Sequence, residues 1–212
     1  MTTVLMGVNK TTESVSFERF AGMCSILAGI VHFLYAAAFV VISRSAPELG
    51  ALLSGLFLLL AGLLSMTAFA GLYQRLRVTE AGFAMWALLL GSLGTLGAAI
   101  HGGYDLANIL NPVASYAPDL PSQIDPRGLL TFGIVGVSLL VFAWLMGYQG
   151  QFPKGLVYTG YLLAVLLVVI YLARLIILDP GNPVLLVPVL ISGFVVNPGW
   201  YVWLGLNLWR GK

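Results

Sequence analysis

The stretch GLVYTGYLLAVLLVVIYLA, residues 155–173, contains no charged residue and is bracketed by Lys154 and Arg174. As a helix it would rise about 28 Å at 1.5 Å per residue, close to the roughly 30 Å thickness of a bilayer's hydrocarbon layer. Five further uncharged stretches of this length or longer run from 20 to 43, 49 to 74, 81 to 104, 128 to 153 and 180 to 209. The sequence therefore predicts six transmembrane helices.

The composition supports the same interpretation. Apolar residues make up 59% of the 212 residues and charged residues only 8%. Soluble domains carry roughly a quarter charged residues, so the surface of this chain must mostly face lipid. We predict an all-α, polytopic membrane protein, a single six-helix bundle whose first partner is the lipid bilayer, integral to the plasma (inner) membrane. The net charge of +2 is too small to indicate a nucleic-acid partner.

The organisation along the chain follows from these stretches. We expect a flexible tail over residues 1–16, which is polar, and one transmembrane domain over residues 17–212. Within that domain the helices are predicted at about 20–43, 50–74, 82–110, 127–149, 155–178 and 184–209. The connection 111–126 contains four prolines and cannot sustain a helix. It is a linker or a lid over one mouth of the bundle, and the sequence leaves both possibilities open.

The distribution of basic residues predicts the orientation. Six spans place both termini on one side, together with seven of the ten basic residues. These seven are Lys10, Arg19, Arg75, Arg77, Lys154, Arg210 and Lys212. Because basic residues favour the cytoplasmic side, we expect both termini to be cytoplasmic.

The third predicted span carries small residues at intervals of three and four. They are Gly91, Gly94, Gly97, Ala98, Gly102 and Gly103. Small residues let helix backbones approach closely in lipid. We expect this span to be central and to neighbour the fourth span, which contains Gly133 and Gly136; a seam for dimerisation is the alternative.

Polar side chains inside a membrane are costly, so each one is a candidate for function. His101 and Asp105 share a helix face near the outer boundary, and Arg174 reaches a similar height on the fifth span. The candidate ligand-binding residues at this level are His101, Tyr104, Asp105, Arg127, Tyr171 and Arg174. One interpretation has Arg174 binding an anionic group while Asp105 orients His101. The other is an ion pair between Asp105 and Arg174 that locks two helices. We predict no metal site, since the ligands are too few.

A second candidate cluster lies near the midplane, where His32 and Asn197 fall at similar depth. Asn197 precedes Pro198, which removes a backbone donor and predicts a kink in the last span. Broken helices often line binding sites in transporters. The alternative is a buried polar pair in which His32 and Asn197 satisfy each other.

The sequence contains no motif that indicates a particular reaction, so it does not predict whether the protein is an enzyme or which cofactor it uses. One hypothesis is a structural, accessory or sensing role through a membrane-protein partner, a homo-oligomer or lipid. The other is a binding protein, transporter or membrane enzyme for a small or lipidic ligand, with anionic ligands among the candidates, at the outer His/Asp/Arg site. The second hypothesis predicts an open pocket at the outer cluster, and the first predicts a sealed one.

Overall fold

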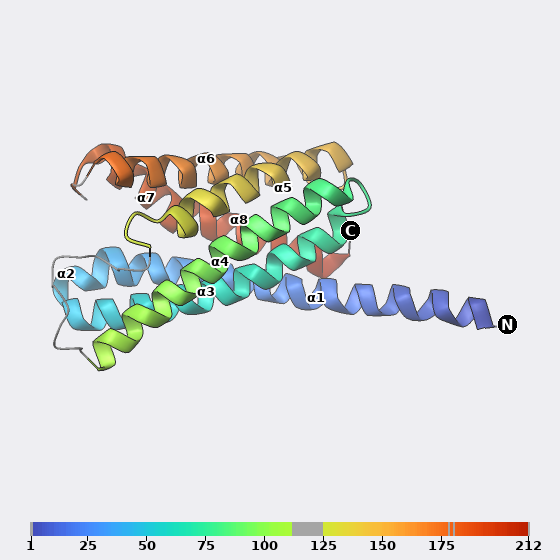
Figure 1. The fold of residues 1–212 in the computed structure, drawn as a ribbon, viewed down its shortest axis with the longest axis horizontal. Coiled ribbons are helices and arrows are strands. Elements are labelled where there is room, and N and C mark those ends of the chain that lie inside the picture. The colour runs from blue at the N-terminus through green and yellow to red at the C-terminus, as the bar shows by residue number, and fades with distance from the viewer. Residues whose placement is uncertain (1, 112–124, 178, 180, 212) are drawn as a thin grey trace.

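The computed structural model describes residues 2–111, 125–177, 179 and 181–211, with side chains from Ser16 onward. Every regular element in this part of the chain is helical (Figure 1), and η denotes a π-helical segment. The elements are α1 (Thr2–Ala36), η1 (Ala37–Ile42), α2 (Ser43–Ser45), α3 (Pro47–Leu76), α4 (Ala81–Leu110), η2 (Leu129–Ile134), α5 (Val135–Gln149), α6 (Lys154–Ile176), α7 (Pro183–Ile191), η3 (Ser192–Val196) and α8 (Asn197–Arg210).

Six of the resulting helices are long and apolar enough to cross a membrane, which confirms the predicted fold class. They are Ser16–Ser45, Pro47–Leu76, Ala81–Leu110, Leu129–Gln149, Lys154–Ile176 and Pro183–Arg210. Both chain termini lie at the same end of the bundle (Figure 1). We call this the terminal end and the other the opposite end.

Residues 2–16, predicted as a flexible tail, are the first part of α1, and this part projects beyond the bundle as a continuous helix (Figure 1). Most of the 111–126 connection, predicted as a linker or a lid, lies outside the described residues.

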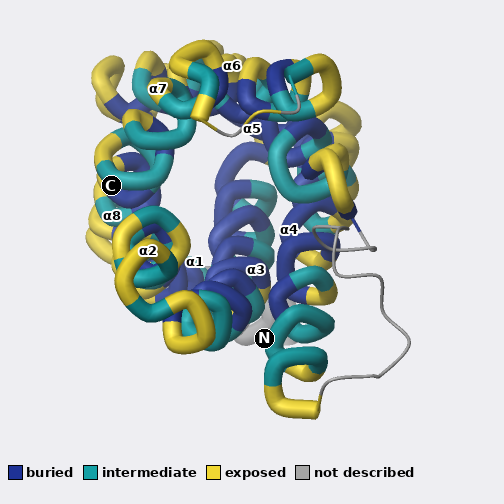
Figure 2. The backbone as a smooth tube through the Cα atoms, turned by 90° about the vertical axis from the view of Figure 1, so that its left-hand side faces the viewer, coloured by how far each residue is buried: buried dark blue, intermediate teal, exposed yellow. Residues whose placement is uncertain are grey.

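The six spans form a ring in chain order. Figure 2 looks along the bundle from the opposite end and shows buried residues on the helix faces that turn inward. Helix α1 packs on α3, α3 on α4, α4 on α5 and α5 on α6. The last span, α7–η3–α8, contacts α6 on one side and α1 on the other, which closes the ring.

Small residues allow these close contacts. A Cβ atom on Gly22 would lie 2.8 Å from the carbonyl oxygen of Gly205, so α1 and α8 meet backbone to backbone. On α4, a Cβ on Gly102 would lie 2.6 Å from the Gly55 oxygen of α3, and one on Gly94 would lie 2.6 Å from the Leu130 oxygen of η2. The small residues of α4 therefore serve contacts within the chain. The predicted neighbour is confirmed, but α4 is one wall of the ring and not its centre.

The large buried side chains are concentrated in the terminal half of the bundle. Phe69 of α3 and Phe142 of α5 are fully buried, with ring centroids 5.5 Å apart, and Tyr201 of α8 lies 6.2 Å from Phe69. The same core contains Leu72, Leu76, Leu139, Leu145, Met146, Leu156, Leu163, Trp200, Leu204 and Leu208. The ring is thus filled at its terminal half, and the space inside it lies toward the opposite end.

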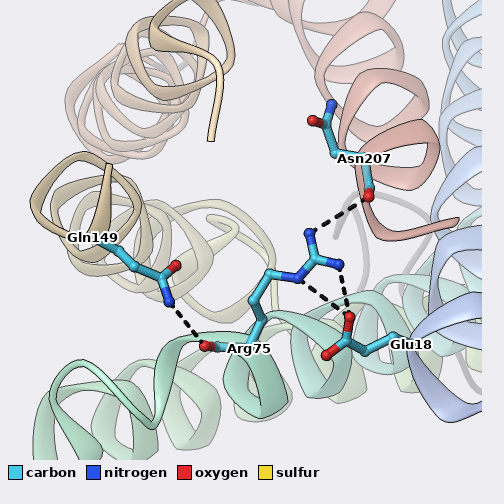
Figure 3. A network of polar contacts seen from close by, with 4 residues as sticks. All are labelled: Glu18, Arg75, Gln149 and Asn207. Atoms are coloured by element: carbon cyan, nitrogen blue, oxygen red, sulfur yellow. Dashed lines mark hydrogen bonds and ion pairs between the residues drawn. The ribbon is translucent and has the colours of Figure 1, made fainter. Parts of the chain in front are cut away.

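A polar network closes the terminal end (Figure 3). The Arg75 guanidinium donates to the Glu18 carboxylate at 2.7 Å and to the Asn207 backbone oxygen at 3.4 Å. Gln149 donates its side-chain amide to the Arg75 backbone oxygen at 3.2 Å. These contacts join α1, α3, α5 and α8. The guanidinium also lies 5.6 Å from the Phe152 ring centroid.

Candidate ligand-binding cavity

A cavity of about 330 Å³, the central cavity, occupies the ring between its middle and the opposite end. Its walls are mostly apolar and come from all six spans, with Leu58, Ala98, Val135, Leu167 and Val189 among them. Its size falls within the range of ligand pockets, about 300–1,000 Å³. A void of this size is much larger than the defects that close-packed interiors usually leave. The ring therefore encloses space for a ligand.

A second cavity of about 450 Å³, the mouth cavity, lies against the ends of α3, α4 and η2. His101, Asp105 and Asn108 of α4 line it, together with Asp125 and Pro126. The two cavities adjoin, because six residues line both. These are Tyr35, Phe39, Leu58, Thr131, Phe132 and Arg174. The two clusters that the sequence placed at different heights therefore line adjoining cavities.

Three of the six candidates from the outer cluster line the mouth cavity: His101, Asp105 and Arg174. The other three, Tyr104, Arg127 and Tyr171, line neither cavity in the described part of the chain. Arg127 is exposed, and Tyr171 packs on η2, where its ring would meet a Cβ on Gly133 at 3.1 Å.

The expected ion pair between Asp105 and Arg174 is not formed among the described residues. Asp105 instead accepts from His101 Nε2 at 3.2 Å. Arg174 donates to the Pro126 backbone oxygen at 3.3 Å, and its guanidinium lies 5.5 Å from the Phe132 ring centroid. The guanidinium of Arg174 thus contacts a carbonyl and an aromatic face, and it forms no ion pair with a described carboxylate.

The acidic groups near the mouth have other partners. Asp125 is buried, and its Oδ2 accepts from the Thr131 backbone nitrogen and hydroxyl, both at 2.9 Å. This contact caps the start of η2, whose first amides lack helical partners. Asp105 is hydrogen-bonded to His101, so both carboxylates that line the mouth cavity have partners within the protein. Arg44 and Arg174 carry the only full charges among the described residues that line the central cavity.

His32 and Asn197 both line the central cavity, but they do not form the expected hydrogen-bonded pair. His32 Nδ1 lies 2.8 Å from the Ala28 oxygen, and its ring stacks on Tyr201 with centroids 4.9 Å apart. His32 lies twelve residues before Arg44 on the first span, which places it about three helical turns deeper.

Three π-helical segments surround the central cavity, one each in the first, fourth and last spans. Their lining residues are Phe39 and Val40 of η1, Thr131 and Phe132 of η2, and Ser192 and Gly193 of η3. Segments of this type are rare and occur frequently at functional sites. The segment η3 directly precedes Asn197 and Pro198, where the sequence predicted an irregular helix. The irregular backbone of all three spans therefore faces the same space.

Several lining residues were not predicted. The residues Tyr35, Arg44, Ser65, Thr95 and Tyr201 line the central cavity but are not among the candidates that the sequence indicates. The hydroxyl of a serine or threonine in a helix can donate to a backbone carbonyl one turn earlier, as Thr95 does to the Gly91 oxygen at 2.8 Å. The presence of such a residue in a span therefore does not indicate a binding site. The depth of these residues in the membrane can be calculated from the sequence. Whether their side chains point toward the inside of the ring cannot.

Comparison of the chain with protein families, with curated proteins and with solved structures finds no match. The chemistry of the cavity is therefore the basis for a functional proposal.

Proposed function

We propose that this protein binds a small anionic amphiphile inside its helix ring, with the anionic group at Arg174 and Arg44. The observation that carries the proposal is the contrast within the central cavity: mostly apolar walls, two arginines, and no acidic side chain among its described lining residues. An arginine guanidinium presents donors that match carboxylate and phosphate oxygens. Apolar walls would accommodate the ligand's hydrocarbon part.

The contacts of Arg174 and the presence of a cavity beside it favour this function over a purely structural role. A locked ion pair with no cavity would have favoured a structural or accessory protein. Instead, Arg174 lines open space in both cavities without an ionic partner in the described chain. A receptor, a transporter and a membrane enzyme all bind a ligand, and we propose this binding step without choosing among the three classes.

The test measures binding of radiolabelled dodecanoate to protein in phosphatidylcholine nanodiscs, corrected for uptake by empty nanodiscs. Hydrogen bonds to a charged group are worth about 1.5–3 kcal/mol, so Arg174→Gln should weaken binding by at least about tenfold. Arg127→Gln is the matched control, because Arg127 has the same charge near the same end and lines neither cavity.

Equal affinity of the two variants, with both folded, would contradict the assigned role of Arg174. Failure of the folded wild-type protein to bind dodecanoate or dodecyl phosphate above the level of empty nanodiscs would overturn the proposal itself.

A further inference from the structure

The inner end of the central cavity carries a group of uncharged polar side chains, which we call the deep niche. Its members are His32, Ser65, Thr95, Asn197 and Tyr201. They come from α1, α3, α4 and α8, so the niche is assembled from four spans. The packed layer of Phe69 and Phe142 lies beyond it toward the terminal end. The niche is therefore the floor of the cavity.

Part of the niche is occupied by bonds within the protein. The Thr95 hydroxyl donates to the Gly91 oxygen at 2.8 Å. His32 Nδ1 faces the Ala28 oxygen at 2.8 Å, and a carbonyl can only accept, so Nδ1 carries the hydrogen. In the neutral ring, Nε2 is then an acceptor that the backbone does not use.

The other members retain hydrogen-bonding capacity. Ser65 is 1% exposed, and its hydroxyl has no partner with hydrogen-bond geometry in the described structure, although the Tyr201 hydroxyl lies near it. The side-chain amide of Asn197 makes no hydrogen bond to a described residue. Buried polar groups are nearly always satisfied, and leaving one without a partner is costly. The niche thus presents donors and acceptors toward the cavity.

Building on the proposed function, we infer that the ligand is polar at both ends: an anionic head at Arg174 and Arg44, an apolar middle, and a distal uncharged hydrogen-bonding group, such as a hydroxyl, in the deep niche. The depth of His32 below Arg44, about three helical turns along the first span, sets the scale of the separation between the two polar ends. The Leu58, Ala98 and Leu167 side chains line the space between. A distal hydroxyl can both donate and accept, as Ser65, Asn197 and His32 require.

The test compares competitors for radiolabelled dodecanoate in the same nanodiscs: unlabelled dodecanoate, ω-hydroxydodecanoate and dodecanol. The terminal hydroxyl of ω-hydroxydodecanoate loses hydration on entering the cavity, so an apolar floor would disfavour it. We expect ω-hydroxydodecanoate to bind at least about fivefold more tightly than dodecanoate, as one well-made hydrogen bond would provide. Dodecanol, which lacks the anion, should bind more weakly than both.

Two variants assign the preference to the niche. Ser65→Ala and Asn197→Leu should each reduce or reverse the preference for the ω-hydroxy compound while dodecanoate still binds. Ser54→Ala is the matched control, because Ser54 is on the same helix and lines only the mouth cavity, where its hydroxyl donates to Ala51. Arg174→Gln should weaken both acids by a similar factor and leave their ratio unchanged.

The outcomes separate the two proposals. Dodecanoate binding that is sensitive to Arg174→Gln, with ω-hydroxydodecanoate equal or weaker, would overturn the bipolar ligand and leave the proposed function standing; ordered water would then fill the niche. A preference that survives in both niche variants would also overturn it. No binding of either acid by folded protein would overturn the proposed function as well.

Discussion

The Glu18 carboxylate lies 2.7 Å from the Arg75 guanidinium at the terminal end of the ring, beyond the packed aromatic layer that forms the floor of the central cavity. The Arg75 side chain is only 9% exposed and that of Glu18 is 22% exposed, so the pair is largely removed from solvent (Figure 3). It joins two helices whose partner residues are 57 positions apart in the chain. The ring is consequently closed at the terminal end, on the far side of the aromatic layer from the central cavity.

Removing the Glu18 charge should destabilise the protein, because a buried guanidinium loses its counter-charge. Breaking a fully buried pair costs about 3–5 kcal/mol, and the partial exposure of Glu18 lowers our expectation for Glu18→Gln to about 2 kcal/mol. The measurement is the thermal midpoint in nanodiscs. Arg77→Gln is the control, since the exposed Arg77 guanidinium lies 6.0 Å from the Tyr73 ring centroid and forms no ion pair with a described residue. Its loss should cost less than about 1 kcal/mol.

The double variant Glu18→Gln/Arg75→Gln checks the pairing itself. If the two groups interact, its destabilisation should fall short of the sum of the single variants by about 0.5–3 kcal/mol. Strict additivity would contradict an energetic role for this ion pair.

The close contact between α1 and α8 predicts a sharp difference between two glycines. In Gly29→Ala the new Cβ would lie 2.7 Å from the Pro198 oxygen, whereas at Gly199 a Cβ would meet nothing within 4 Å. Overpacking costs about 1–3 kcal/mol, so Gly29→Ala should lower the thermal midpoint. Gly199→Ala should leave it unchanged or raise it slightly, because alanine favours helix. Equal midpoints for the two variants would argue against this helix contact.

The fold could be predicted because a single physical requirement dominates it. Backbone groups in lipid must bond within their own segment, so each long uncharged stretch becomes a helix. The predicted 50–74 and 82–110 correspond to α3 (Pro47–Leu76) and α4 (Ala81–Leu110), with differences of a few residues at the ends. The helical course of residues 2–16 was not predicted, because this segment is polar and lies outside the bundle.

The candidate site could be predicted in height but not in direction. A fixed rise per residue places His101, Asp105 and Arg174 at one level, and all three line the mouth cavity. Arg127 and Tyr171 were placed at the same level, yet neither lines a cavity in the described chain. The direction of a side chain around its helix depends on how that helix packs against its neighbours, and one sequence does not contain this information directly. For the same reason, the sequence did not indicate that Ser65 and Tyr201 line the central cavity.

Filling the central cavity should abolish binding without unfolding the protein. Ala98 of α4 lines the cavity and is 8% exposed, so Ala98→Phe would place an aromatic ring in open space. We expect the affinity for dodecanoate to fall by more than about tenfold. The free energy of unfolding, followed by the thermal midpoint, should change by less than about 1 kcal/mol, because the ring enters unoccupied space and does not overpack the core. Ala107→Phe, at an exposed position of the same helix, is the control and should bind as wild type. Unchanged affinity in folded Ala98→Phe would place the ligand elsewhere.

The side of the membrane to which the cavity opens can be determined by labelling with a membrane-impermeant maleimide. Among the residues whose side chains are described, Arg19, Arg75, Arg77, Lys154 and Arg210 lie at the terminal end. This predicts that the terminal end is cytoplasmic and that the end of the ring that holds the cavities faces away from the cytoplasm. Asn111→Cys, exposed at the opposite end, should react in intact cells. Val78→Cys, 78% exposed in the loop between α3 and α4, should react only after permeabilisation. Both are made in a Cys24→Ala background, although Cys24 is only 5% exposed. The reverse pattern would show that the arginines of the cavity face the cytoplasm, and the ligand would then have to be sought among cytoplasmic anions.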